Sequence, residues 1–110
     1  MTTNKTIKDS VAFVPAEFIE YAEGSVVSKT ILKKPAGNIT IFAFDKGEGL
    51  AEHSSPHEAI IQLLDGEAEI TIGEKPIKVQ AGQSIILPAN IPHSLKASER
   101  FKMILIMIKN

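Results

Sequence analysis

The feature that most constrains the fold is the alternation of short apolar runs with turn-forming residues from about Val26 onward. Each run is rich in β-branched or aliphatic residues, and glycine, proline, asparagine or aspartate interrupts it before a helix of ordinary length could form. This pattern is typical of antiparallel barrels and sandwiches. A chain of 110 residues, 44% of them hydrophobic, can bury one core. The sequence therefore predicts a single all-β domain over residues 1–110.

The turn residues also set the expected strand boundaries. Two prolines exclude residues 88–92 from a strand interior, because each would remove a ladder donor. Asp65-Gly66 is the strongest hairpin signal in the chain, so a turn is expected there. Residues 1–25 are expected to be irregular, and within them 14–24 could form one helical turn or an edge strand. The expected strands lie at residues 26–32, 39–44, 52–64, 67–72, 77–79, 84–87 and 101–108.

The last expected strand, Phe101 to Ile108, is apolar on both faces and is interrupted only by Lys102. A strand without alternation must be covered on both sides. The cover could come from the second sheet together with the N-terminal segment, or from another subunit. So short a chain leaves little polypeptide to cover an outer face, and we therefore expect a homodimer.

Composition excludes several classes of function. The net charge is −1 and the lysines are scattered, so neither nucleic acid nor an anionic membrane is an expected partner. The absence of cysteine excludes disulfides, thiolate ligands and thiol nucleophiles. Residues 1–10 lack the apolar core of a signal peptide, and the C-terminal apolar run is shorter than the ~20 residues of a membrane helix. These features predict a cytoplasmic protein.

Two histidines, His53 and His93, lie within an ordered series of turn residues: Gly47, Gly66, Gly82 and Pro88. This series resembles the two motifs of the cupin family, the first over residues 47–66 and the second over residues 82–97. The first family motif contains a glycine, a His-x-His pair, a glutamate and a second glycine. The second contains a glycine, a proline and a histidine. The resemblance implies a double-stranded β-helix, or jelly-roll, barrel of two antiparallel sheets.

Two ligand positions of the family pattern carry other residues here. The second histidine of His-x-His is Ser55, and the glutamate is Ala59. Two of the four metal ligands that the resemblance implies are therefore missing, which favours the members of the family that do not use a metal. We expect a ligand cavity formed by His53, Ser55, Ala59 and His93.

Strand parity predicts which side chains share the interior. Positions 53, 55, 57 and 59 project to one face, and the strand that bears His93 is expected across the barrel from it. Converging imidazoles suit zinc, iron, manganese or copper. His57 could supply a third ligand, or it could lie at the barrel mouth and bind nothing. Likewise, His53 could be a ligand or a buried imidazole bonded to Ser55 or to a carbonyl.

Three further polar residues of this region, Glu52, Glu58 and Gln62, have the opposite parity, which places them outside the barrel unless Pro56 forces a bulge that reverses the register. The sequence also lacks the Gly-x-Ser-x-Gly elbow of many hydrolases. We therefore expect a small-molecule-binding barrel that is non-catalytic or independent of metal, with no cofactor. One alternative is a metal-dependent isomerase or oxygenase acting on a small organic acid or sugar derivative through His53, His57 and His93. Another is a structural or interaction module.

Overall fold

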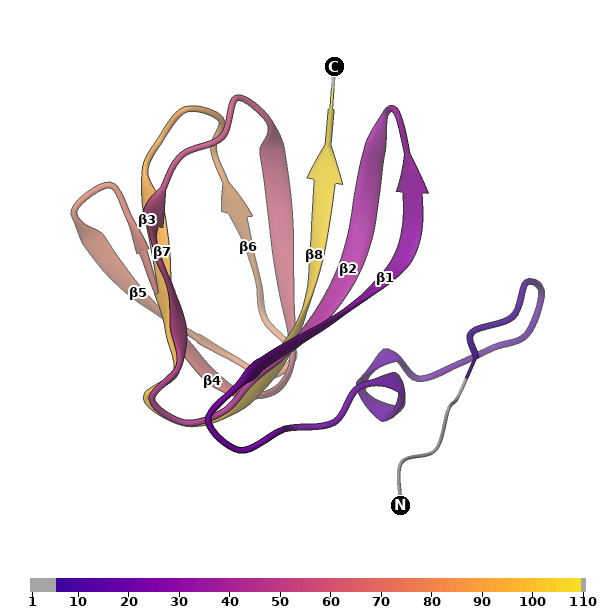
Figure 1. Ribbon diagram of the computed structural model, residues 1–110. Coiled ribbons are helices and arrows are strands. Elements are labelled where there is room, and N and C mark those ends of the chain that lie inside the picture. Colours follow the sequence, from indigo (N-terminus) through magenta and orange to yellow (C-terminus); the bar gives the residue numbers. More distant parts are fainter. Residues whose placement is uncertain (1–5, 110) are drawn as a thin grey trace.

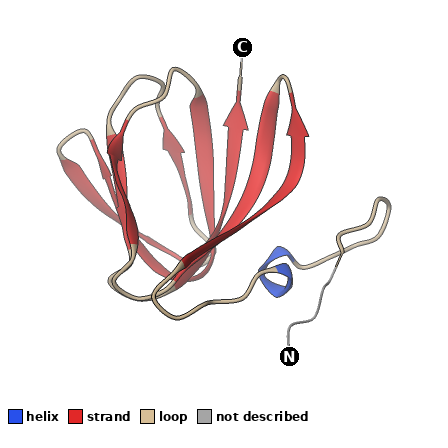
Figure 2. Cartoon of the chain, in the orientation of Figure 1, coloured by secondary structure: helices blue, strands red, loops and turns tan. Residues whose placement is uncertain are grey.

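The computed structural model describes residues 6–109, which form a curled antiparallel β-barrel preceded by a projecting N-terminal segment (Figure 1). Strands dominate the chain, and the described residues include a single short 3₁₀ helix, η1, at Pro15–Phe18 (Figure 2). No helix in this part of the chain is long and apolar enough to cross a membrane. The strands are β1 (Val26–Lys34), β2 (Gly37–Phe44), β3 (Gly49–His53), β4 (Glu58–Ile72), β5 (Lys75–Gln80), β6 (Ser84–Leu87), β7 (His93–Lys96) and β8 (Phe101–Ile108).

These elements confirm the predicted all-β fold. β6 and β8 have the predicted boundaries, while β1 and β2 extend further toward the turn between them. Of the two alternatives for residues 14–24, the structure has the helical turn, and Pro15 stands at its start, where a missing N–H costs nothing. Residues 1–5 of the expected irregular segment lie outside the described residues.

The strand β4 joins the two halves of the barrel. Residues 58–66 pair with β8, and 59–62 also pair with β6 on the other side. Residues 67–72 then pair with β5, and 69–72 with β7. The main strand path is β1-β2-β8-β4-β7-β3, so a single long strand contributes to both sheets.

The hairpin predicted at Asp65-Gly66 is wrong, because β4 continues through both residues. The register with β8 shifts between Leu63 and Asp65, which marks a β-bulge, and Gly66 has a φ of 75°. A Cβ at Gly66 would also collide with the carbonyl oxygen of Arg100, the residue that precedes β8. Asp-Gly supplies the same positive φ at a bulge as at a tight hairpin turn. Here the dipeptide bends the strand from one sheet into the other.

The core lies between the two halves of the barrel. Phe44 of β2 and Phe101 of β8 stack with ring centroids 4.5 Å apart, and both are fully buried. Ile61 and Ile70, which lie on opposite sides of the bend in β4, are also fully buried in this cluster. The aromatic pair and the aliphatic chains of β4 therefore hold both sheets around one interior.

The N-terminal segment covers part of the outer face of β2 and β8. Ile19 packs there with Ile41 and Ala43 in a second, smaller buried cluster. The hydroxyl of Tyr21 donates a hydrogen bond to Asp65 at 2.6 Å, next to the bulge. Burial and the Asp65 carboxylate raise the pKa of Tyr21, so the hydroxyl remains a donor. Lys102 donates to the Ala16 carbonyl at 2.8 Å, and thus the segment is tied to β8 as well.

We expect Gly66→Ala to destabilise the domain by about 2–4 kcal/mol, because the methyl group meets a backbone oxygen as well as an unfavourable φ. Urea unfolding measures the free energy of unfolding. Gly82→Ala is the matched control, since Gly82 has a φ of 90° and open space around its Cα. Equal losses in the two variants would show that the close approach to β8 contributes nothing.

Candidate functional site

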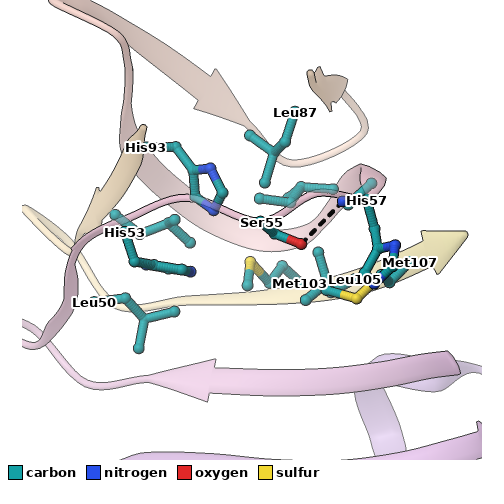
Figure 3. Close-up of a pocket in the computed structure, with 12 residues that line it drawn as sticks. Leu50, His53, Ser55, His57, Leu87, His93, Met103, Leu105 and Met107 are labelled. Carbon is teal, nitrogen blue, oxygen red and sulfur yellow. Dashed lines mark hydrogen bonds between the residues drawn. The ribbon is translucent and has the colours of Figure 1, made fainter. Parts of the chain in front are cut away.

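A cavity of about 110 Å³ lies inside the barrel and opens beside His53, His57 and Ser55 (Figure 3). His93 and Leu95 of β7 and residues of β4, β6 and β8 form the remainder of its wall. Most of the wall is aliphatic or thioether side chain, so the three histidines and one serine are its polar features. The lining residues are Leu50, His53, Ser55, His57, Ala59, Ile61, Leu87, His93, Leu95, Met103, Leu105 and Met107.

The two histidines singled out in the sequence are direct cross-strand neighbours. His53 on β3 pairs with His93 on β7, and their ring centroids are 4.4 Å apart at an interplanar angle of 66°. The structure thus brings them together, as expected, but the expected arrangement across the barrel is wrong. The two strands are adjacent in one sheet, and antiparallel pairing alone places the rings within contact distance.

A bulge in β3 directs His53 into the cavity. Leu50 pairs with Leu95 and His53 pairs with His93, so β3 has one more residue than β7 between these pairs. The extra residue allows both Leu50 and His53 to line the cavity, although their sequence positions have opposite parity. Parity alone could not predict this, because the sequence gives no sign of a bulge at Ala51 or Glu52.

Each imidazole is oriented by a backbone carbonyl two residues before it. His53 Nδ1 is 2.9 Å from the carbonyl oxygen of Ala51, and His93 Nδ1 is 3.3 Å from that of Ile91. A neutral histidine in this arrangement carries its proton on Nδ1, because the carbonyl oxygen can only accept. The remaining nitrogen of each ring, Nε2, then has a lone pair available to the cavity.

His93 is 8% exposed, whereas His53 is exposed at the open end of the cavity. Burial lowers the pKa of His93 below the usual imidazole value; the hydrogen bond with the Ile91 carbonyl opposes part of this shift, and the nearby His53 adds a smaller lowering. His93 is therefore neutral at pH 7. The cavity offers a hydrogen-bond acceptor rather than a fixed positive charge at this position.

The loop between β3 and β4 holds Ser55 and His57 at the mouth. The Ser55 hydroxyl oxygen accepts a hydrogen bond from the His57 backbone N–H at 3.1 Å. The Ser55 carbonyl in turn accepts from the Asn90 N–H at 2.7 Å, which ties this loop to the 88–92 loop. Asn90 has a φ of 66°, a conformation that asparagine tolerates better than most residues. The expected continuous strand over residues 52–64 is wrong: β3 ends at His53, β4 begins at Glu58, and Pro56 lies in the loop between them.

The predicted cavity residues His53, Ser55, Ala59 and His93 all line the cavity, and His57 lines it too. Three polar residues expected outside the barrel are exposed and absent from its wall: Glu52, Glu58 and Gln62. Sequence reasoning did not predict that Met103, Leu105 and Met107 of β8 line the cavity; we call these three residues the cavity floor. Their shared parity in a strand apolar on both faces was the available signal.

A metal site was the alternative use of the same histidines. Within residues 6–109, no three histidine, cysteine, aspartate or glutamate side chains form a group that could hold a metal ion. His57 thus shares the cavity with the His53 and His93 pair without joining it in a three-ligand cluster in this conformation. The assignment of His53, His57 and His93 as metal ligands stays a prediction.

A curled barrel with a histidine pair facing its interior defines the chain as a jelly-roll protein with an internal cavity. The family model for the cupin domain matches residues 40–109, more than half of the chain. The chain therefore belongs to the cupin family, which confirms the resemblance seen in the two motifs. No curated protein matches the sequence.

Solved structures agree with this assignment. The conserved protein SPY1581 of unknown function from Streptococcus pyogenes is 34% identical, with a TM-score of 0.90 over 100% of this chain and 96% of that one. A cupin 2 conserved barrel domain protein from Leptotrichia buccalis is 47% identical, with a TM-score of 0.83, but the match covers 86% of this chain and 46% of that one. A cupin superfamily protein from Desulfitobacterium hafniense is 26% identical, with a TM-score of 0.89 over 96% and 97% of the two chains.

The lowered pKa of His93 predicts a pH dependence of stability. The unfolded chain binds a proton at the ordinary imidazole pKa of about 6.5, whereas folded His93 binds it only at lower pH. The contribution of His93 to the free energy of unfolding is therefore complete above pH 6.5 and is lost as the pH falls below it. Urea unfolding at pH 7.5 and pH 5 should show a smaller loss for His93→Asn than for the wild type. Equal losses of unfolding free energy in the two proteins would contradict the lowered pKa of His93.

Proposed function

We propose that the protein is a small-molecule-binding cupin whose cavity acts without a metal, as a binding site rather than a catalytic centre. The observation that carries the proposal is the polarity of the cavity. Its histidine pair consists of two imidazoles whose Nδ1 atoms are engaged by backbone carbonyls, and most of the remaining wall is apolar. Ser55 and Ala59 stand where the family pattern has two further metal ligands.

The histidine pair favours a particular kind of ligand. The two rings, whose centroids are 4.4 Å apart, present two Nε2 acceptor lone pairs to the same space when each carries its proton on Nδ1, and neither ring can donate to the other while both Nδ1 protons are used elsewhere. A ligand group that donates a hydrogen bond would satisfy one of these Nε2 lone pairs. We therefore infer a ligand with a hydroxyl, an N–H or a protonated acid group at the histidine end.

The size and the lining of the cavity restrict the remainder of the ligand. A volume of about 110 Å³ is somewhat smaller than the ~150 Å³ cavity known to hold a benzene molecule. The wall also contains Leu87, Met103 and Leu105, which favour an apolar body. A compact molecule with one polar end, such as a phenol or a short-chain hydroxy compound, fits both conditions.

Phenol and toluene are a matched pair of probes, because they have nearly the same shape and differ in the donor group. We expect phenol to bind about five-fold more tightly than toluene, which corresponds to one hydrogen bond of about 1 kcal/mol. Titrations followed by two-dimensional NMR give both dissociation constants and show whether signals of His53 and His93 shift. Equal affinities for the two probes would refute the role of the imidazole acceptors.

Two variants test whether His53 is responsible for the preference for phenol over toluene. His53→Leu should abolish most of the preference for phenol, because it removes the acceptor at the open end while keeping an apolar wall. Glu52→Gln is the control, since Glu52 is the preceding residue and lies outside the cavity. A loss of discrimination in both variants would indicate a general disturbance of β3 rather than loss of a ligand contact.

The second candidate is a metal-dependent enzyme acting on a small organic acid or sugar derivative through His53, His57 and His93. The observation that favours it is the presence of all three histidines around one cavity. The chemistry of the pair is also suitable, since Nε2 lone pairs of neutral imidazoles are good ligands for first-row metals. Tight stoichiometric zinc binding by the wild type that is lost on His57→Ala would favour this candidate over the first.

The positions of Ser55 and Ala59 allow a direct test of the missing ligands. Both residues line the cavity with the histidine pair, so Ser55→His with Ala59→Glu should create a four-ligand site and raise zinc affinity by orders of magnitude. Titration calorimetry compares this variant with the wild type. Ser54→His with Gln62→Glu is the control, because it adds the same groups at exposed positions outside the cavity. A gain in the control equal to that in the cavity variant would contradict the prediction.

A further inference from the structure

The sulfur atoms of this chain are concentrated in the cavity floor. The sequence has three methionines and no cysteine. Met1 lies outside the described residues, and the other two methionines, Met103 and Met107, both line the cavity. Thiols are the side chains that peroxides oxidise first, and thioethers come next. Because thiols are absent, the two thioethers of the floor are the groups that a peroxide entering the cavity would oxidise.

The two methionines differ in their distance from the loop of residues 54–57 at the cavity mouth. Met107 pairs with Ala59, the second residue of β4 after this loop, whereas Met103 pairs with Leu63. Four residues of a strand separate the two pairs by roughly 13 Å. Met103 is 1% exposed, and Met107 is only partly buried (Figure 3). Met107 is therefore the thioether nearer to the mouth.

The small side chain of Ala59 leaves Met107 open to the cavity. Ala59 lies directly across from Met107 in the β4–β8 ladder, and both residues line the cavity. Cross-strand neighbours on one face shield each other in proportion to their size, and a methyl group shields little. Hydrogen peroxide is little larger than water, which needs only about 10–15 Å³ of such space, so the cavity of about 110 Å³ admits it easily.

The mouth also offers a hydrogen-bond donor to an oxidised methionine. The Ser55 hydroxyl oxygen accepts from the His57 backbone N–H at 3.1 Å, and this bond does not use the hydroxyl proton. Ser55 and Met107 line the same cavity. A sulfoxide oxygen on Met107, which is a strong acceptor, thus has a donor on the same cavity wall.

We propose that Met107 is an oxidation site through which peroxides regulate ligand binding in the cavity, an inference that rests on the proposed binding function. The thioether sulfur attacks one oxygen of hydrogen peroxide, so an S–O bond forms while the O–O bond breaks. The sulfur loses two electrons to the peroxide. The leaving hydroxide takes the proton of the transferred hydroxyl group and becomes water. The product, methionine sulfoxide, is polar and is reduced back to methionine by sulfoxide reductases.

The sulfoxide changes which ligands the cavity favours. An apolar ligand such as toluene would cover the new oxygen without donating a hydrogen bond to it, and burying an unpaired polar group is unfavourable. Phenol carries a donor that can satisfy the oxygen. Oxidation should therefore weaken the binding of toluene more than the binding of phenol.

Peroxide treatment of the full chain, followed by peptide mass spectrometry, measures the oxidation rate of each methionine. Cleavage after Lys102 and Lys109 yields one peptide that contains both residues, and its fragment ions distinguish them. In the folded protein we expect Met107 to oxidise about ten-fold faster than Met103, because oxidation follows exposure. In urea the two rates should agree. Equal rates in the folded protein would overturn the proposal.

A filled cavity tests the route that the peroxide takes. Ala59→Leu should slow the oxidation of Met107, because the larger side chain occupies the space across from the thioether. Gln62→Leu is the control, since Gln62 is an exposed residue of the same strand and lies outside the cavity. Ala59→Val makes the same test with a smaller side chain if Ala59→Leu does not fold. Undiminished oxidation of Met107 in a folded Ala59 variant would exclude the cavity as the route.

Titrations of the oxidised protein with toluene and phenol test the regulation. We expect the dissociation constant of toluene to rise about ten-fold and that of phenol to rise less. Met107→Leu, which conserves volume, should keep its affinity for toluene after peroxide treatment, whereas Met103→Leu should lose it as the wild type does. An unchanged affinity in the oxidised wild type, or an equal loss in Met107→Leu, would overturn the proposal.

The two readouts separate this proposal from the proposed function. If the reduced protein binds neither probe, the binding function fails, and with it the regulation of binding. The oxidation rates of Met107 and Met103 still decide whether Met107 is the oxidation site, because they require no ligand.

Discussion

The close approach of two backbones at Gly66 is the constraint on which the rest of the barrel depends. β4 must leave one sheet and enter the other without interrupting its hydrogen bonding, and it does so at a bulge where the strand meets the carbonyl of Arg100. A side chain at this position would separate β4 from β8. Because β4 pairs with β5, β6, β7 and β8, this bend positions most of the strands that form the cavity wall.

A second irregularity, the bulge in β3, makes the interior chemically specific. Without it, Leu50 and His53 would project to opposite faces, and the cavity would lose either an apolar side chain or its outer imidazole. The carbonyls of Ala51 and Ile91 then fix the orientation of the two rings. Backbone groups rather than other side chains therefore determine which nitrogen atoms face the cavity. Such an arrangement tolerates considerable variation in the surrounding sequence.

The fold was largely predictable because turn residues and apolar alternation carry the strand pattern. The 84–87 and 101–108 strands and the family motifs followed from the residues themselves. His53, Ser55, His57 and Ala59 line one cavity as expected, although a loop over residues 54–57 replaces the expected strand face. Asp65-Gly66 was misinterpreted because the same dipeptide serves a hairpin and a bulge, and only pairing with β8 distinguishes them. The β3 bulge and the adjacency of the histidine strands were inaccessible, since both depend on how strands distant in sequence pair.

The strand β8 has consequences for how this protein can change over evolutionary time. Its residues Met103, Leu105 and Met107 line the cavity, whereas Ile104 packs against the cluster with Ile19 and Ile106 lies on the same outer face. Consecutive residues of β8 thus contribute alternately to the cavity wall and to the outer face of the sheet. A substitution in this strand therefore disturbs the packing of one face or the other. New ligand preferences should therefore arise at the mouth, in the loop that carries Ser55 and His57 and in its partner at Asn90. The floor would remain fixed while the rim diversified.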